Sequence, residues 1–288
     1  MNAHEWYKGG QFTSVNGLKV YFRRSGEGEP LVCIHGFPSS SWDFEKIWSS
    51  LISRFDTFAP DLIGLGKSDK PKQPLPVSLQ ADIIEALLIQ EDITNAHILA
   101  HDLGDTVAQE LLARQIMHSS HISWKSCIFM NGGIFPETHR PLLIQKILIS
   151  SFGPFVAKLM SKKSFEKNMR KVFSQAHPPS DEFIQETWNL INENEGKSMI
   201  PRLIRYMQER VTNRERWVNP LSNNVVPILL INGSEDPISG KHMADRFSEL
   251  VPNADIVLLE NSGHYPHLET PELVSEAIFR FHDRINCR

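Results

Sequence analysis

The chain has 288 residues, of which 41% are hydrophobic and 22% are charged, the composition of an ordinary globular protein. With 30 basic and 34 acidic residues the net charge is −4, so we expect no nucleic-acid partner, which would require a strong basic surplus. The first ten residues lack the basic and apolar regions of a signal peptide, and no apolar run approaches the roughly 18 residues that span a bilayer.

Apolar β-type runs and helical patterns alternate through the first 131 residues. The runs that predict strands in this part are residues 31–34, 57–59, 96–100 and 126–130. The segments that predict helices between them are residues 41–53, 78–90 and 106–117. This alternation is typical of a parallel sheet that is covered by helices on both faces.

The alternation stops after Asn131, and residues 134–217 contain helical and loop patterns without a convincing strand. The α/β pattern then returns. Its predicted elements are a strand at 226–231, a helix at 241–250, a strand at 255–259 and a last helix that starts at Thr270 and Pro271. We therefore predict one α/β core, residues 1–133 and 218–288, interrupted by a helical insertion at 134–217.

The three cysteines, Cys33, Cys127 and Cys287, are far apart and fit neither a disulfide framework nor zinc spacing. Two of them lie inside apolar runs, where cysteine behaves as a small core hydrophobe. Such usage favours a reducing compartment. We expect a cytoplasmic protein without a membrane span, present as a monomer or a homodimer.

The stretch Ala100-His101-Asp102-Leu103-Gly104 joins a predicted strand to a predicted helix. Small residues two positions either side of the central one are the pattern of a nucleophile elbow, a tight turn that projects its central side chain out of the sheet. That side chain is the carboxylate of Asp102, and the N-terminus of the following helix would keep it ionised. The alternative is that Asp102 only caps the helix.

Two possible partners of Asp102 follow later strands. Asp236 lies in NGSEDP at 232–237, and His264 lies in NSGHYPHLETPE at 261–272. The chain order Asp102, Asp236, His264 is the nucleophile–acid–base order of α/β-hydrolases, and each residue follows the carboxyl end of a strand, where such sheets bind ligands. These three residues are the predicted catalytic triad.

The tetrapeptide His35-Gly36-Phe37-Pro38 follows the predicted strand 31–34. In an arrangement with a nucleophile elbow, this loop and the residue after the nucleophile supply the backbone N–H groups of an oxyanion hole. We expect these donors at Phe37 and Leu103, and we place His35 among the pocket residues. Asn131, at the end of strand 126–130, is a further pocket candidate that orients water or the insertion. The chain contains no GxSxG motif that would form a competing serine elbow.

These motifs, together with DLIGLGKSDKP at 61–71, resemble the α/β hydrolases of the epoxide hydrolase and haloalkane dehalogenase group over nearly the whole chain. The segment NGGIFPETHRPLL at 131–143 resembles the subgroup of mesoderm-specific transcript protein and its bacterial relatives. The resemblance implies the α/β-hydrolase fold, with a mostly parallel sheet flanked by helices and a helical cap inserted after the sixth strand. It implies a small-molecule substrate and water as partners, with no cofactor and no metal.

An aspartate nucleophile predicts a particular reaction. A carboxylate needs no deprotonation and displaces a leaving group from saturated carbon, which leaves an alkyl ester on Asp102. His264, oriented by Asp236, would then activate water to hydrolyse that ester. Epoxides and alkyl halides suit this chemistry, whereas carboxylic esters suit it poorly.

The group that assists the leaving group separates the subclasses. Haloalkane dehalogenases hold the halide with side-chain donors at the positions of Leu103 and Phe37, and these two side chains donate nothing. Epoxide hydrolases use two cap tyrosines, and Tyr206 lies where the resemblance places the second. The place of the first, near Ser150, has no tyrosine.

The aromatic residues nearest to that place are Phe152 and Phe155, which we expect in an apolar pocket roof, and His139 or His177 would be a substitute donor. We therefore rank epoxide hydrolase-like activity first and hydrolytic dehalogenation second. The third hypothesis is a weakly active or inactive ligand-binding protein that keeps the fold.

Overall fold

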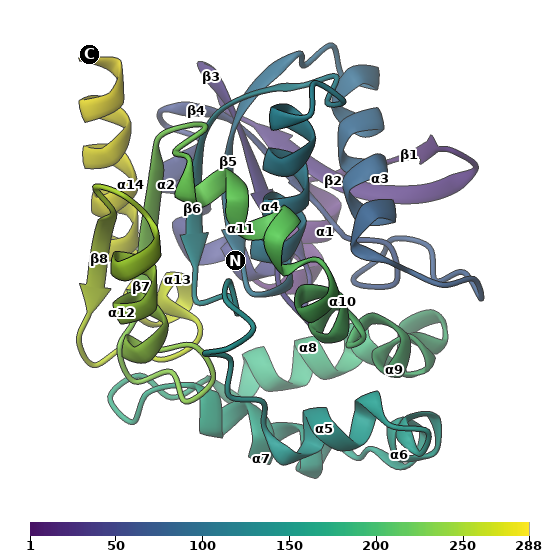
Figure 1. Cartoon of the computed structure of the whole chain (residues 1–288). Helices are drawn as coiled ribbons and strands as arrows, with labels where there is room; N and C mark the ends of the chain where they lie inside the picture. The colour runs from purple at the N-terminus through teal and green to yellow at the C-terminus, as the bar shows by residue number, and fades with distance from the viewer. Residues whose placement is uncertain (288) are drawn as a thin grey trace.

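The computed structural model describes residues 1–287 as a mixed sheet between two layers of helices (Figure 1). A further group of helices, inserted between β6 and β7, lies across one end of this sandwich and forms the lower part of Figure 1. Within residues 1–287, no helix is both long and apolar enough to cross a membrane.

The sheet has eight strands in the order β1-β2-β4-β3-β5-β6-β7-β8. β1 pairs with β2 and β2 with β4 in antiparallel fashion, and all the other pairs are parallel. The strands are β1 (Gln11–Val15), β2 (Leu18–Ser25), β3 (Glu29–Ile34), β4 (Phe55–Pro60), β5 (Asn95–His101), β6 (Ser123–Met130), β7 (Ile228–Gly233) and β8 (Asp255–Leu259).

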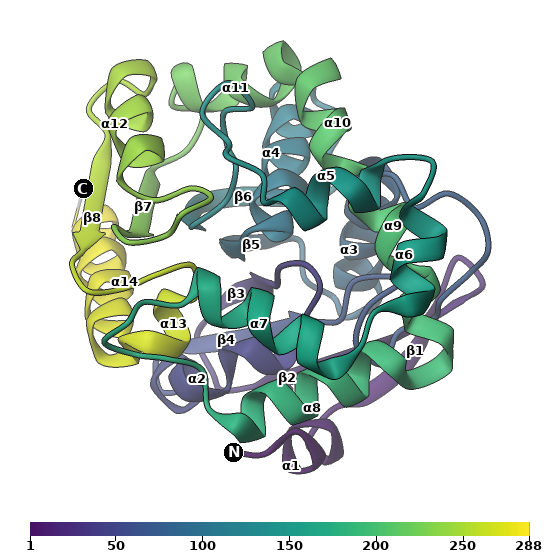
Figure 2. The ribbon, with the colours of Figure 1, turned by 90° about the horizontal axis from the view of Figure 1, so that it is seen from below.

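Two sets of helices cover the sheet, and Figure 2 shows them on opposite sides of it. The helices on one side are α3 (Val77–Gln90), α4 (Leu103–Ile116), α11 (Arg214–Ser222) and α12 (Lys241–Leu250). Those on the other side are α1 (Ala3–Lys8), the 3-10 turn η1 (Ser41–Phe44), α2 (Glu45–Leu51), α13 (Pro266–Glu269) and α14 (Pro271–Asn286).

The central strands β3, β5, β6 and β7 are apolar runs that are buried along almost their whole length. Continuous apolar runs of this kind are expected of parallel strands that are covered on both faces. Because these strands are parallel, their carboxyl ends meet at one edge, and the loops after them lie close together. That edge faces the inserted helices.

The inserted helices are α5 (Leu143–Ile149), α6 (Gly153–Leu159), α7 (Lys162–Val172), α8 (Asp181–Asn192), η2 (Glu193–Ser198), α9 (Ile200–Leu203) and α10 (Tyr206–Thr212). We call this group the cap. The predicted boundary at residue 217 falls inside α11, which packs along the core helix α4. We therefore propose that the core resumes near Arg214, a few residues earlier than the sequence pattern indicates.

The predicted fold class is confirmed: the chain has the α/β-hydrolase architecture, with the insertion after the sixth strand. The hairpin β1–β2 and the helix α1 are additional to the predicted elements. Helix α4 starts at Leu103, three residues before the predicted start at Thr106, because the turn that carries Asp102 is complete within one residue.

Candidate active site

Asp102 occupies a one-residue turn between β5 and α4. Its backbone has φ 49° and ψ −103°, a conformation in the left-handed region that non-glycine residues rarely adopt. The turn allows no side chain at its neighbour Gly104, where a Cβ would meet the carbonyl oxygen of Ile34. A Cβ at Gly36 would lie 2.9 Å from the Asp102 Cβ. Asp102 makes no capping hydrogen bond to its helix, so its carboxylate is free for other partners.

Two donors converge on the buried Asp102 carboxylate. The backbone N–H of Phe37 donates to Oδ2 at 3.0 Å. The hydroxyl of Tyr206 donates to Oδ1 at 3.2 Å and lies 3.5 Å from Oδ2. Leu103, the other predicted oxyanion donor, is the first residue of α4 and is buried. The loop after β3 and the cap helix α10 thus both reach the predicted nucleophile.

His264 and Asp236 form a buried pair beside Asp102. Nδ1 of His264 lies 2.8 Å from Asp236 Oδ2, so it donates there and leaves Nε2 as the nitrogen that gains or loses a proton. Asn131 donates to the same carboxylate oxygen at 2.9 Å, and the hydroxyl of Ser239 donates to it at 2.7 Å. The backbone N–H of Ile238 donates to Oδ1 at 2.8 Å. The predicted pocket residue Asn131 therefore supports the acid of the predicted triad.

The three residues of the predicted triad shift one another's pKa values toward their charged forms. Burial lowers the pKa of His264, but the carboxylates of Asp236 and Asp102 outweigh burial and raise it to about 9. Burial raises the pKa of Asp236, and the charge of His264 outweighs this and brings it to about 2. Asp102 is also pulled below its ordinary pKa, because His264 and Arg210 outweigh burial. At neutral pH the site therefore holds two carboxylates and one imidazolium.

Arg210, which the sequence patterns did not single out, links the turn at Asp102 to the cap. Its Nη2 donates to the carbonyl oxygen of Asp102 at 3.0 Å and lies 4.0 Å from Oδ1, and its Nε donates to the hydroxyl of Thr106 at 2.6 Å. The guanidinium also lies 4.5 Å from the ring centre of Tyr206. The signal in the sequence was the spacing of four residues from Tyr206, which places both side chains on one face of a helix.

Two predicted or considered histidines lie near this centre, in different roles. His35 donates from Nδ1 to the carbonyl of Gly36 at 2.8 Å and accepts at Nε2 from the N–H of Leu62 at 2.9 Å, so it shapes the Phe37 loop. His139 is mostly buried, and neither ring nitrogen has a hydrogen-bond partner among the described residues. Burial and the charge of Arg210 lower the pKa of His139 to about 3.

Two predicted pocket residues lie elsewhere. Phe152 is 70% exposed and Phe155 is 65% exposed, so the expectation of an apolar roof at these positions was wrong. Both belong to the outer side of α6, whose inner side packs through buried Gly153 and Ala157. His177 is exposed as well. Apolar composition indicated that the cap has a buried side but not which residues face it.

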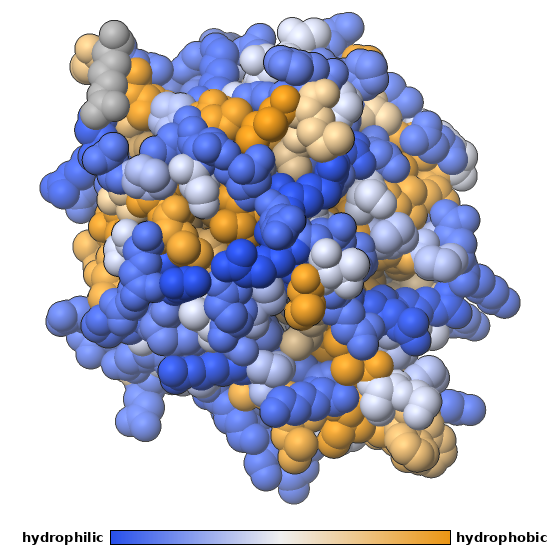
Figure 3. All heavy atoms as spheres, viewed as in Figure 1, coloured by the Kyte–Doolittle hydropathy of each residue, from blue (hydrophilic) through white to orange (hydrophobic). Residues whose placement is uncertain are grey.

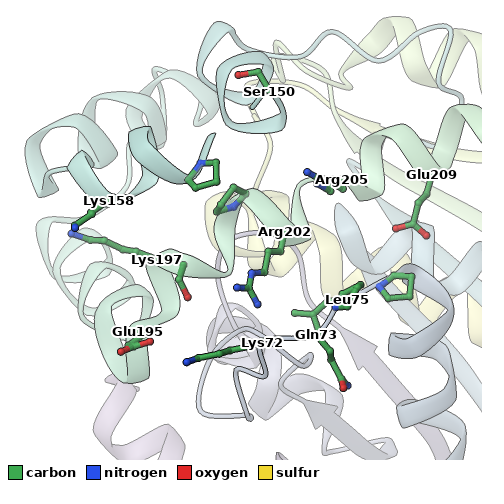
Figure 4. A pocket seen from close by; sticks show the side chains of 15 residues that line it. Lys72, Gln73, Leu75, Ser150, Lys158, Glu195, Lys197, Arg202, Arg205 and Glu209 are labelled. Atoms are coloured by element: carbon green, nitrogen blue, oxygen red, sulfur yellow. The ribbon is translucent and has the colours of Figure 1, made fainter. Parts of the chain in front are cut away.

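A cleft of about 860 Å³ opens at the border of cap and core (Figure 4). Its walls include apolar Leu75 and Pro201 and the basic residues Lys72, Arg202 and Arg205. No triad residue lines this cleft. The three residues of the predicted triad are buried, and Tyr206 of the cap contacts Asp102 directly.

Two groups of side chains bring three potential metal ligands within 4.8 Å of one another. They are Glu29, His97 and His282, and Asp43, His101 and His267. Neither group includes a triad residue. His101 donates from Nε2 to the carbonyl oxygen of His264 at 2.7 Å, so the second group lies behind the triad.

An elbow with a strained central residue, a buried His–Asp pair and a backbone donor from the loop after β3 define an α/β hydrolase. The family model for the alpha/beta hydrolase family matches residues 31–277, and the chain belongs to that family.

Two related proteins indicate the subgroup of the family that this chain resembles. The human mesoderm-specific transcript homolog protein is 38% identical over 282 residues, covering 93% of this chain and 84% of that protein. The LipZ hydrolase of Mycobacterium tuberculosis is 34% identical over 280 residues, with 96% of each chain covered. The predicted resemblance to the mesoderm-specific transcript subgroup is thus confirmed.

Solved structures agree on the fold. Haloalkane dehalogenase DbeA from Bradyrhizobium elkani aligns with a TM-score of 0.83 at 20% identity, covering 96% of this chain and 98% of that one. Epoxide hydrolase CorEH aligns with a TM-score of 0.75 at 18% identity, covering 96% and 99%. At such identities the likeness concerns the fold and leaves the substrate open.

Proposed function

We propose that the protein hydrolyses epoxides through a covalent alkyl ester of Asp102. The observation that carries the proposal is the hydroxyl of Tyr206, which donates to the Asp102 carboxylate at 3.2 Å. An electrophile that reaches this carboxylate necessarily lies beside a phenolic donor. Ring opening of an epoxide needs this pair, because one atom must attack carbon while another protonates oxygen.

In the first step a carboxylate oxygen of Asp102 bonds to one epoxide carbon, and the ring C–O bond breaks. The ring oxygen keeps the electron pair and takes the phenolic proton of Tyr206. Burial and the negative charge of Asp102 hold the pKa of Tyr206 above its ordinary value, so the hydroxyl is fully protonated beforehand. Ester formation removes that negative charge, which makes Tyr206 a stronger acid as the oxygen needs its proton.

Once the ester has neutralised Asp102, His264 releases its Nε2 proton to solvent. In the second step the free Nε2 takes a proton from a water molecule, and the hydroxide attacks the ester carbonyl. The oxyanion accepts a hydrogen bond from the N–H of Phe37, and Leu103 is the proposed second donor; each is worth roughly 3 kcal/mol. The bond to the alcohol then breaks, and the departing alkoxide takes the proton from His264. The proton left on the Asp102 carboxyl returns to Tyr206 and His264 regains a proton from solvent, so the net reaction adds one water to the epoxide to give a diol.

His139 is the proposed second donor, in place of the missing first tyrosine. A Cβ at Gly133 would lie 2.5 Å from His139 Nδ1 and would also meet Nη1 of Arg210, so both side chains lie directly against Gly133. With its pKa lowered to about 3, His139 is neutral at physiological pH. A neutral imidazole carries one N–H, which can donate to a developing alkoxide.

The dehalogenase alternative lacks side-chain donors for a halide next to Asp102. Leu103 and Phe37 offer apolar side chains where the dehalogenases carry halide-binding donors. Their backbone N–H groups are committed to the carboxylate or its oxyanion in the proposed reaction.

Trapping the covalent intermediate tests the proposal. His264→Gln should accumulate an adduct with an aryl epoxide such as styrene oxide, seen as a mass increase equal to the epoxide and located on Asp102 by peptide mapping. Asp102→Asn in the same background should give none. An adduct with a primary alkyl bromide alone would favour dehalogenation, and no adduct with either reagent would refute the covalent mechanism.

The donors are tested in the same trapped background. Tyr206→Phe should slow epoxide adduct formation about a hundredfold or more, within the range of general acid catalysis. His139→Phe should slow it about tenfold, and His139→Gln, which restores an N–H donor, should recover part of the rate. His177→Phe, at an exposed position of the cap, is the control and should not change the rate.

A further inference from the structure

The outer side of the cap carries apolar side chains that nothing in the described chain covers. Leu143 is 74% exposed and Phe152 is 70% exposed, and Phe155 and Leu159 are each 65% exposed. All four lie on α5, on α6 or at their ends, within 17 residues of sequence. Single exposed apolar side chains need no explanation, but a gathering of this kind usually marks a binding surface.

Basic residues are interspersed with these apolar ones in the sequence and follow them along α7. Residues 143–171 contain seven Lys or Arg and a single acidic residue, Glu166, for a net charge of +6. Because the whole chain has a net charge of −4, all other residues together carry −10. We define the cap face as the four exposed apolar residues together with the exposed lysines Lys146, Lys158, Lys163, Lys167 and Lys171.

The helices that carry the cap face lie together. Figure 1 places α5, α6 and α7 along the bottom of the molecule, and Figure 2, seen from below, shows them on the near side of the core. In Figure 3 hydrophobic surface gathers at the lower edge of the molecule, over α5 and α6, with hydrophilic side chains around it. α7 turns Phe165, Met169 and Val172 inward, and Lys163, Lys167 and Lys171 on the same helix are exposed.

The charge argues for one kind of occupant. A second copy of this chain would bring two faces of the same +6 segment together, and like charges at close range oppose such contact. An anionic lipid surface complements both properties, since phosphates attract the lysines while phenylalanine and leucine enter the boundary between headgroups and acyl chains.

We infer that the cap face docks the protein on an anionic lipid surface. Ser150, Pro154 and Lys158 belong to the same helical hairpin and also line the cleft at the border of cap and core. Docking would therefore place the mouth of that cleft at the lipid surface, which suits a substrate that partitions into lipid. This inference does not depend on the proposed reaction.

Vesicle co-sedimentation of the full chain tests the inference. The protein should bind vesicles of an equal mixture of phosphatidylcholine and phosphatidylglycerol and bind pure phosphatidylcholine at least tenfold more weakly. High salt should weaken binding to the mixed vesicles, because the screening length falls from about 10 Å at 0.1 M to about 3 Å at 1 M. Equal binding to both vesicle types, or none to either, would overturn the inference.

Variants separate the two contributions. Phe152→Ser with Phe155→Ser should weaken binding at least tenfold, whereas Lys163→Gln and Lys167→Gln should each cost about fivefold, the equivalent of about 1 kcal/mol per basic residue near an anionic surface. Val211→Ser, at a 67% exposed position of α10 outside the cap face, is the matched control and should bind normally.

Thermal unfolding of each variant checks that these exposed substitutions leave the fold intact. If Val211→Ser weakens binding as much as the phenylalanine pair, the cap face is not the docking surface. If sedimentation without vesicles shows self-association that Phe152→Ser abolishes, the face joins copies of the chain, and the lipid assignment is wrong.

Discussion

The ion pair between His264 and Asp236 should make the stability of the protein depend on pH in a defined range. The folded state raises the pKa of His264 from an ordinary value of 6.5 to about 9. The pair's stabilisation is therefore fully present below pH 6.5 and disappears as the pH rises through 9. At 1.36 kcal/mol per pH unit, this difference is worth roughly 3 kcal/mol in the free energy of unfolding.

Urea unfolding of the wild type and His264→Gln between pH 6 and pH 10 measures this effect. Asp236, Asp102 and Glu269 face His264 in both proteins, and only the wild type has a proton to lose there. Asp43, whose pKa burial raises to about 8, also titrates in this range, and the charge of His264 lowers that pKa, so both proteins are compared in an Asp43→Asn background.

We expect the wild-type advantage over His264→Gln to shrink by roughly 3 kcal/mol from pH 6 to pH 10. A difference between the two proteins that stays constant across this range would refute the reasoning, because it would mean that His264 is not held as an imidazolium by the two carboxylates.

Other consequences concern the nucleophile turn. At 4.0 Å and an effective dielectric constant of 20, the charge of Arg210 is worth about 4 kcal/mol to the Asp102 carboxylate, so Arg210→Met should move the acid limb of adduct formation up by about 3 pH units. Arg210→Lys should restore it, Thr106→Val should leave it in place, and an unchanged limb in Arg210→Met would contradict this coupling. Gly104→Ala should lower the free energy of unfolding by about 3 kcal/mol, because its Cβ meets a backbone carbonyl. Gly17→Ala, where only a positive φ opposes the side chain, should cost about 1 kcal/mol in the same urea titration.

The core of the molecule could be predicted because its signals are local. Asp102, Asp236 and His264 each follow an apolar run, and parallel strands bring such positions to one edge of the sheet regardless of their distance in the chain. The hairpin β1–β2 also has a local signal in the sequence. Asn16 and Gly17 form an Asn-Gly turn with positive φ at both residues.

The cap could not be predicted to the same depth. Whether Phe152 faces the core or the solvent depends on how α6 packs against neighbouring helices, and amino-acid composition does not predict that packing. Arg210 was missed for a related reason: a lone arginine on a short helix is usually solvated, and only the meeting of α10 with α4 makes it buried. Residues that act across the boundary of cap and core need the tertiary structure.

The charge of Asp102 explains how His264 can be protonated in the free protein and act as a base later in the proposed reaction. In the free protein the charge of Asp102 helps to hold the pKa of His264 at about 9, so the ring is protonated and cannot yet take a proton from water. Formation of the ester neutralises Asp102, which removes one of the two charges that sustain the imidazolium. His264 therefore releases its Nε2 proton to solvent and becomes a base only after Asp102 has formed the ester. Premature activation of water is avoided without any movement of the ring, because the first bond made in the reaction changes the charge that controls the second.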